Sequence, residues 1–357
     1  MPTIAAPHLH QLVTLIVRAM GSTAQEAADV ADHLVAANLA GHDSHGVGML
    51  PDYVRLLHAG LLAPNQTLQL VADHGGVLVL DARRGFGQAM AKEAMRLGIE
   101  RAKAQGSVVV AMRNSAHIGR IGHWAEQCAA AGMVSVHFVN VADHAPLQAP
   151  FGCADARLGT NPLAVGVPGA AGETELLLDM ATSAIAFGKA RVARNKGVPV
   201  PEGVLIDEHG RPTTDPTTYV DTRQGALLAF GAHKGSGLAI LCEVLGAAVT
   251  GGATIAPQHQ REDGIHNSML SFIVDVGAIG DRAHIAAETA AVGAWVKAAP
   301  RVPGCDEVLL PGEPEQRARE RRLADGVAID DKSLTDILAA ARSLGLADTE
   351  LDQALGR

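Results

Sequence analysis

Residues 107–123 read Ser-Val-Val-Val-Ala-Met-Arg-Asn-Ser-Ala-His-Ile-Gly-Arg-Ile-Gly-His. After Ser107 the first residues are apolar and mostly β-branched, which is the composition of a buried strand. A polar loop with His117 follows, and a helix is expected after it. Loops at the ends of such strands hold ligands in α/β proteins, and Gly119 and Gly122 let the backbone approach a bound molecule. The stretch predicts an α/β fold whose loop is either a ligand contact or an ordinary turn.

The sequence on either side of this unit changes character along the chain. Apolar side chains recur at helical spacing over residues 9–35, and helices are expected again from about residue 280 onward. The β-like runs 68–72 and 77–81 are separated by turn residues and predict a hairpin. Residues 140–220 are rich in turns and short strands. Helices at both ends around a mixed middle predict two domains.

The composition excludes several classes of protein. The 357 residues carry 29 Lys and Arg against 38 Asp and Glu, a formal charge of −9, which does not attract nucleic acid or anionic lipid. No segment reaches about 18 uninterrupted apolar residues, so no membrane span is expected. The four cysteines form no Cys-x-x-Cys pair and the first residues lack a basic signal-peptide region, which predicts a reduced, cytoplasmic protein. The 16 histidines outnumber Phe, Trp and Tyr together.

Residues 42–45 read His-Asp-Ser-His and lie in a polar loop between two expected helices. Histidine is suited to proton transfer near neutral pH, and Ser44 or Asp43 is placed to orient an imidazole. The alternative is a capping loop in which Asp43 and Ser44 satisfy backbone donors. The spacing of His42 and His45 also admits a metal site, although no acidic or cysteine partner with ligand spacing lies nearby.

A third candidate site is the Gly-rich stretch 231–237, which reads Gly-Ala-His-Lys-Gly-Ser-Gly and is expected to begin a helix reaching about Val249. Backbone amides at a positive helix end bind anions, and Lys234 adds a charge. The alternative is a helix start with a solvated lysine. The chain has no Gly-x-Gly-x-x-Gly fingerprint with an acidic residue about 20 positions on, so a Rossmann cofactor site is not supported.

Seven motifs occur in order along nearly the whole chain. They are Gly41-His-Asp-Ser-His-Gly-Val47, Asn114-Ser-Ala-His-Ile-Gly119, Leu158-Gly-Thr-Asn-Pro162, Asp179-Met-Ala-Thr-Ser183, Lys196-Gly-Val-Pro-Val-Pro-Glu-Gly203, Pro212-Thr-Thr-Asp-Pro216 and His233-Lys-Gly235. Each is weak alone. Together they resemble the malate/L-lactate dehydrogenase family, whose members lack a Rossmann fold.

The resemblance implies an α/β (α+β) protein that works as a homodimer. One domain, residues 76–239, is expected to bind a nicotinamide cofactor in a non-Rossmann manner around a mostly antiparallel sheet. A helical domain is expected to form from both chain ends, residues 1–75 with 240–357. NADH is the favoured cofactor, because the resemblance points to an NADH-using member and no basic cluster is assigned to a 2′-phosphate. NADPH is the alternative.

The same resemblance implies roles for individual residues. His45 matches the family's proton donor, with Ser44 beside it as a relay. His117 matches a second active-site histidine that is the acid–base group in some members, and both histidines stay open as the donor. No metal ligand is implied. The implied cofactor contacts are Thr160, Asn161, Asp179, Met180, Ala181, His233, Lys234, Gly235, Pro311, Gly312 and Glu313.

One position departs from the family pattern. Many members have an arginine four residues after the loop histidine, where it holds the substrate carboxylate, and here that residue is Met49. We therefore expect Arg120, on the glycine-flanked loop beside His117, to bind the carboxylate, since a bidentate arginine does this best. The alternative is that Arg120 is a solvated loop residue. Met49 is expected to line an apolar pocket wall, which favours aryl 2-oxo acids.

The expected reaction is reversible hydride transfer between NAD(P)H and C2 of a small 2-oxo or 2-hydroxy carboxylic acid. The alternative within the same class is a reductase of a cyclic imine carboxylic acid. Two other classes remain as alternatives. One is a metal-dependent lyase or hydrolase with His42 and His45 as ligands, and the other is a non-enzymatic nucleotide-binding regulator.

Overall fold

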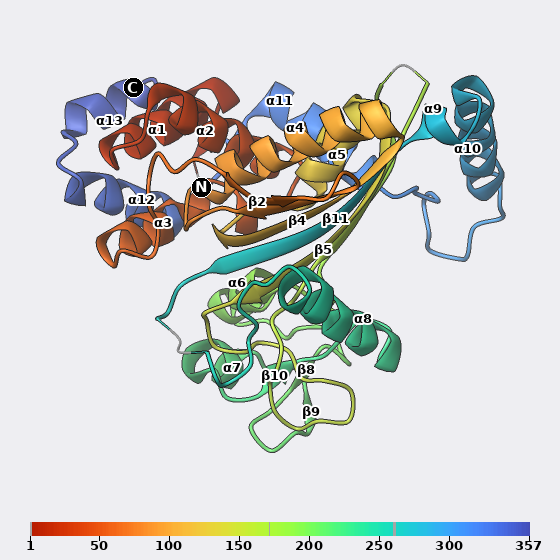
Figure 1. Cartoon of the computed structure of the whole chain (residues 1–357). Coiled ribbons are helices and arrows are strands. Elements are labelled where there is room, and N and C mark those ends of the chain that lie inside the picture. The colour runs from red at the N-terminus through yellow and green to blue at the C-terminus, as the bar shows by residue number, and fades with distance from the viewer. Residues whose placement is uncertain (1, 171, 260–261) are drawn as a thin grey trace.

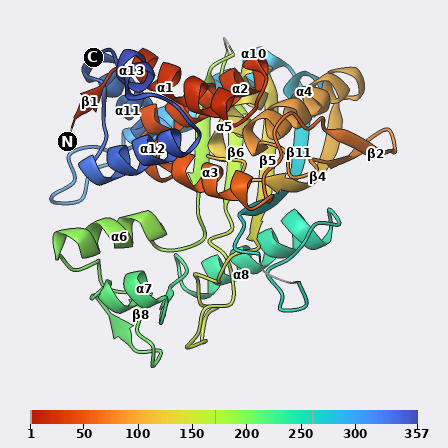
Figure 2. The same ribbon diagram turned by 90° about the vertical axis from the view of Figure 1, so that its left-hand side faces the viewer.

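The computed structural model describes residues 2–170, 172–259 and 262–357. A helical lobe and a smaller lobe lie on either side of a curved sheet, and a helical arm extends from one end of that sheet (Figure 1). Both chain ends lie in the helical lobe (Figure 2). Strand β1 (Thr3–Ile4) pairs there with β12 (Val327–Ala328) in antiparallel orientation.

The helical lobe is built from segments near both ends of the chain. Its apolar residues recur at helical spacing and form one buried core, in which Leu12, Ile16 and Leu34 are fully buried. Thr23 caps the second helix by accepting a hydrogen bond from the backbone N–H of Glu26. The elements are α1 (Ala6–Ala19), α2 (Ala24–Leu39), the 3₁₀ turns η1 (Asp43–His45) and η2 (Val47–Met49), α3 (Leu50–His58), α12 (Asp331–Ser343) and α13 (Asp348–Ala354).

A seven-stranded sheet with the order β2-β3-β4-β11-β5-β6-β7 separates the two lobes. It is mixed, because β3 and β4 are parallel whereas the other described pairs are antiparallel. The pair β2–β3 is the predicted hairpin, and the helices α4 (Gly87–Gln105) and α5 (Gly122–Ala130) cover one face of the sheet (Figure 1). The strands are β2 (Gln69–Asp73), β3 (Val77–Asp81), β4 (Ser107–Ala116), β5 (Met133–Ala142), β6 (Leu163–Pro168), β7 (Thr174–Met180) and β11 (His266–Asp275).

The expectation that residues 240–357 belong to a helical domain is wrong for β11. This strand lies in the middle of the sheet between β4 and β5 and pairs with both in antiparallel orientation. Met269, Leu270 and Ile273 are buried there. Burial of apolar residues on a central strand therefore brings a late segment of the chain into a sheet whose other strands all come earlier.

The smaller lobe has its own apolar core around Leu205 and Tyr219. Its short strands form a sheet with the order β10-β8-β9. The Gly-rich stretch begins α8, as predicted, and α8 packs against β5 and continues into a π-helical turn. The elements are α6 (Phe187–Lys196), β8 (Leu205–Ile206), β9 (Pro212–Thr213), α7 (Thr217–Thr222), β10 (Ala226–Leu227), α8 (His233–Glu243) and η3 (Val244–Ala248).

After β11 the chain forms the arm, which consists of α9 (Val276–Ile279) and α10 (Arg282–Lys297), and then returns as α11 (Glu313–Asp325). The arm stands away from the sheet (Figure 1). Gly293 is the one buried residue of α10, whereas Trp295 is 81% exposed. None of the helices in the described residues is long and apolar enough to cross a membrane.

Candidate active site

The His-Asp-Ser-His loop follows α2 and is held by a buried amide of that helix. Asn38 donates from Nδ2 to the Asp43 carboxylate (2.7 Å) and accepts a hydrogen bond from the backbone N–H of Val47 (2.8 Å). Gly46 leaves room for this amide, because a Cβ there would lie 2.2 Å from Oδ1 of Asn38. The amide therefore holds η1, the turn that ends at His45, in one place.

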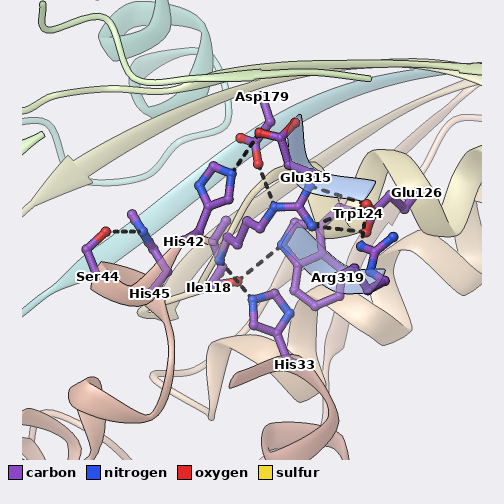
Figure 3. Close-up of polar contacts among 11 residues, drawn as sticks. His33, His42, Ser44, His45, Ile118, Trp124, Glu126, Asp179, Glu315 and Arg319 are labelled. Carbon is purple, nitrogen blue, oxygen red and sulfur yellow. Dashed lines mark hydrogen bonds and ion pairs between the residues drawn. The ribbon is translucent and has the colours of Figure 1, made fainter. Parts of the chain in front are cut away.

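His45 and His117 come from separate loops and meet in the structure. Their rings stack with centroids 5.6 Å apart and an interplanar angle of 21°. The hydroxyl oxygen of Ser44 lies 2.9 Å from Nδ1 of His45 (Figure 3). The three predicted catalytic residues thus lie in one place.

Tyr53 of α3 and Gln88 of α4 complete this cluster, and sequence reasoning missed both. Gln88 donates from Nε2 to the Tyr53 hydroxyl oxygen (2.6 Å), and that oxygen lies 2.8 Å from Nδ1 of His117. All three side chains are buried. Because the phenol oxygen accepts from Gln88, its single proton is available to Nδ1 of His117. A neutral His117 that accepts this hydrogen bond carries its own proton on Nε2.

Burial keeps both imidazoles neutral near pH 7. It lowers the pKa of His45 to about 4 and the pKa of His117 to about 3, because a buried imidazolium loses its hydration. The Asp179 carboxylate acts in the opposite direction on the pKa of His45, whereas His45 lowers the pKa of His117 further. Because a charge on one ring lowers the pKa of the other, the pair takes up one proton before a second, and only at a pH well below 7 in the free protein.

Arg120 is not placed as expected for a substrate ligand. Its side chain is 1% exposed, and it donates from Nε to Asp179 (2.9 Å) and from Nη1 to Glu126 (3.1 Å). Burial lowers the pKa of this guanidinium, but Glu126 and Asp179 outweigh burial and the net direction is upward. The guanidinium already pairs with two carboxylates of the protein, so it connects its own loop to β7 and α5. This arrangement is at odds with both the carboxylate-binding role and the solvated alternative.

The loop after His117 is held by neighbouring side chains. The backbone N–H of Arg120 donates to Nε2 of His33 (2.8 Å), and Nε1 of Trp124 donates to the carbonyl of Ile118 (3.2 Å) (Figure 3). Gly119 makes the first contact possible, because its φ is +74° and a Cβ would lie 2.0 Å from Nε2 of His33. Burial lowers the pKa of His33 well below its ordinary value, so the ring remains a neutral acceptor.

Asn161, an expected cofactor contact, is fully buried. Its Oδ1 accepts from the backbone N–H of Val141 (3.1 Å), and its Nδ2 donates to Glu243 of α8 (2.7 Å). The carbonyl of the preceding Thr160 accepts from the backbone N–H of Thr182 (3.0 Å). The side chain of Asn161 thus fastens α8 to the sheet, and its backbone segment lies beside residues 179–183.

The segment at the end of β7 links the histidine cluster to the smaller lobe. Asp179 pairs with the buried guanidinium described above, and Met180 and Ala181 follow it half-buried. Beyond them, Ser183 Oγ and Gln148 Nε2 are buried without a hydrogen-bond partner among the described residues. Buried polar atoms of this kind call for a partner, and a polar ligand would supply one.

The Gly-rich start of α8 is open to solvent. His233 and Lys234 are exposed in its first turn. Gly235 is buried, and a Cβ there would lie 2.0 Å from the carbonyl oxygen of Phe230, so the packing requires glycine. A helix start with an exposed lysine in its first turn has the properties of an anion site.

The late segment Pro311-Gly312-Glu313 packs against β7. The carbonyl of Pro311 accepts from the backbone N–H of Leu177 (3.0 Å). Gly312 has φ +99° and lies against the same leucine, and Glu313 begins α11. This expected cofactor-side loop therefore lies beside the strand that leads to Asp179.

Met49 and His42 take different roles from the histidine pair. Met49 is half-buried and packs against the core of the helical lobe. His42 lies with Nε2 at 3.0 Å from the Glu315 carboxylate of α11. In the part of the chain that the structure describes, no group of three or more His, Cys, Asp and Glu is placed to hold a metal ion.

A cavity of about 470 Å³ lies near the ends of β3 and β4, apart from the histidine pair. Its lining residues are Asp81, Arg83, Arg84, Asn114, Ala253, His266 and Ser268. The ring of His117 contacts Tyr53 and His45 instead. We therefore assign the candidate catalytic centre from the paired imidazoles and not from the volume of this cavity.

Paired neutral imidazoles between a helical lobe and an α/β sheet suit an enzyme that moves a proton. The chain belongs to the malate/L-lactate dehydrogenase family, because the model of that family matches residues 4–338. It is 49% identical to hydroxycarboxylate dehydrogenase B of Escherichia coli strain K12, over 97% of this chain and 95% of that protein. It is 38% identical to an L-lactate dehydrogenase of Cupriavidus necator, over 96% and 98%. A solved E. coli structure assigned to the malate/lactate dehydrogenases has a TM-score of 0.95 and 47% identity, with 100% and 99% of the chains covered.

Proposed function

We propose that this protein interconverts 2-oxo and 2-hydroxy carboxylic acids by reversible hydride transfer with a nicotinamide cofactor. The observation that carries the proposal is the stacked pair His45 and His117, which provides two imidazoles for one carbonyl oxygen. The relatives are named for oxidation or reduction of hydroxy acids. The lyase or hydrolase alternative has no support among them.

The residues at the sheet edge suit a nicotinamide dinucleotide. Lys234 and the helix start of α8 would hold its phosphates. Ser183 Oγ and Gln148 Nε2, which are buried without a partner among the described residues, would form hydrogen bonds with its polar groups. When bound, the cofactor supplies the hydride. A Rossmann site needs a mainly parallel sheet, whereas one described pair here is parallel. NADH is the proposed form, since no basic cluster is assigned to a 2′-phosphate.

His45 is the proposed proton donor. Its pKa lies above that of His117, because the Asp179 carboxylate favours the charged form of His45. A substrate carboxylate entering the site adds a second negative charge and raises both pKa values. The shared proton of the pair then resides on His45, with Ser44 orienting the ring through Nδ1.

His117 acts in this scheme as a neutral hydrogen-bond donor. The Tyr53 hydroxyl occupies Nδ1, so Nε2–H is directed to the carbonyl oxygen of the substrate. A neutral imidazole polarises a carbonyl without needing a charge, which suits a ring whose pKa is about 3.

The substrate side chain is proposed to be larger than that of pyruvate. Met49 stands where many relatives have arginine, and its thioether adapts to apolar groups such as an aryl ring. We propose that the carboxylate is held by a group other than Arg120, because that guanidinium is buried between Asp179 and Glu126.

A homodimer is proposed because the arm leaves apolar side chains uncovered. Trp295 is 81% exposed and Ile279 73%, and Val302, in the segment that follows α10, is 70% exposed. An apolar surface of this kind on an extended arm fits the face of a second copy. The expected cytoplasmic location also remains a proposal, and all four cysteines are unpaired, as in a reducing compartment.

The test is a screen of NADH and NADPH oxidation at 340 nm with pyruvate, oxaloacetate, phenylpyruvate and a cyclic imine acid. The proposal expects NADH oxidation with 2-oxo acids and higher kcat/KM for phenylpyruvate. Activity with the imine alone would show that the substrate is a cyclic imine acid and not a 2-oxo acid. The absence of turnover with every compound would refute the proposed reaction.

A further inference from the structure

One face of α11 carries a row of charged side chains that contact the His-Asp-Ser-His loop and helix α5. The row consists of Glu315, Arg319 and Arg322, spaced four and three residues apart, and therefore lies on one side of the helix. In Figure 3, Glu315 points toward His42 and Arg319 toward Glu126. We call this row the α11 stripe. On the rest of the helix, Arg317 and Arg321 are exposed.

Arg322 binds the residue that begins the catalytic turn. It donates from Nη1 and Nη2 to the two oxygens of Asp43 (2.6 and 2.9 Å) and also donates to the carbonyl of Asn38 at the end of α2. Asp43 is the first residue of η1, and His45 is the last. A bidentate arginine pair fixes direction as well as distance, so the position of this turn depends on Arg322.

The other two members of the stripe bind on either side of the catalytic pair. Glu315 lies 3.0 Å from Nε2 of His42, the residue before η1. Arg319 donates to Glu126 (3.0 Å), which in turn pairs with Arg120 on the loop that follows His117. The stripe thus contacts the loop of His45 directly and is connected to the loop of His117 through Glu126 of α5.

We propose that α11 positions the two histidine loops relative to each other, and that Arg322 is the positioning residue for His45. The inference rests on the proposed function, because its readout is turnover. The rings stack with centroids 5.6 Å apart, so two loops from different parts of the chain have to keep a fixed position relative to each other. The ion pairs made by α11 fix this relative position.

An ordinary surface ion pair contributes little, but the Arg322 pair differs in geometry. The Arg322 side chain is 20% exposed and that of Asp43 51%, the contact is bidentate, and a second donor from Asn38 shares the same carboxylate. Without Arg322, the Asp43 carboxylate keeps its hydrogen bond from Asn38 and the loop keeps the contact between His42 and Glu315, so His45 gains freedom without loss of the fold. The expected defect is therefore in turnover rather than in stability.

The experiment compares Arg322→Ala with Arg321→Ala, its exposed neighbour. We expect Arg322→Ala to lower kcat by about tenfold to a hundredfold, with KM, NADH binding by fluorescence and the melting temperature close to wild type. Arg321→Ala should match wild type. Arg322→Lys should restore part of the kcat, because lysine keeps the charge but not the bidentate contact.

Asp43→Asn provides a second, independent variant if Arg322→Ala folds poorly. We expect it to lower kcat, and the double variant Asp43→Asn/Arg322→Ala to be no worse than the poorer single one. Wild-type kcat in Arg322→Ala, additive losses in the double variant, or an equal loss in Arg321→Ala would overturn the inference. A wild-type enzyme without 2-oxo acid reduction would instead overturn the proposed function.

Discussion

Replacement of Arg120 by alanine is the most informative test of how the site is built. The side chain is 1% exposed and pairs with Asp179, which is 8% exposed, and with Glu126, which is 21% exposed. Removing one partner of a buried pair costs about 3–5 kcal/mol, because a charge is left without compensation. In the variant Glu126 still pairs with Arg319 at 3.0 Å, so Asp179 is the carboxylate that is left without a partner arginine. We expect a loss near the lower end, about 3 kcal/mol.

Urea unfolding at pH 7 and at one protein concentration measures this loss. Arg157→Ala is the matched control, because its ion pair with Asp155 is 68% and 64% exposed and should contribute about 0–1 kcal/mol. The structural role would be refuted if Arg120→Ala lowered the free energy of unfolding by less than about 1 kcal/mol and raised KM for every 2-oxo acid. Arg120 would then return as the substrate ligand.

Further predictions concern the supporting residues. Tyr53→Phe should lower kcat about threefold to tenfold, the equivalent of one hydrogen bond to His117, with NADH binding by fluorescence unchanged. Gly119→Ala should lower the free energy of unfolding by about 1–3 kcal/mol, because alanine is strained in the left-handed region and its Cβ would clash with His33. Gly21→Ala is the control and should lose less, because its φ is also positive but a Cβ there meets no neighbouring atom. The pKa of His117 falls from 6.5 to about 3 on folding, so its stabilisation is complete above pH 6.5 and is lost as pH falls toward 3. Because His33 and His45 also have lowered pKa values, urea titrations at pH 7, 5 and 4 compare the wild type with His117→Gln; the variant should lose less stability, and an equal loss in both would contradict the prediction.

Local sequence patterns were sufficient to predict many of the helices and strands. The β2–β3 hairpin, the helix that begins at the Gly-rich stretch and the helices at both chain ends all appear where periodicity and turn residues indicated. The place of β11 needed tertiary information, because its partners β4 and β5 are far away in sequence. A strand's own pattern gives no signal for which neighbours it pairs with.

The same limit applies to the site. The loops of His45 and His117 were recognisable from their runs of polar residues, but Tyr53 sits in an amphipathic helix and Gln88 in a helix start, where neither residue type is unusual. Their roles arise from contacts with residues distant in sequence. Arg120 looked available on a glycine-flanked loop because sequence does not reveal that Asp179 folds onto it.

Hydride transfer to C2 can be measured directly. NADH deuterated at C4 on the transferring face is incubated with the protein and phenylpyruvate, and the product is analysed by mass spectrometry. The proposed reaction predicts one deuterium at C2 of the resulting 2-hydroxy acid. Loss of this product in His45→Gln, with NADH binding retained, would further support His45 as the proton donor. A product without deuterium, or no product from NADH or NADPH, would contradict the proposed function.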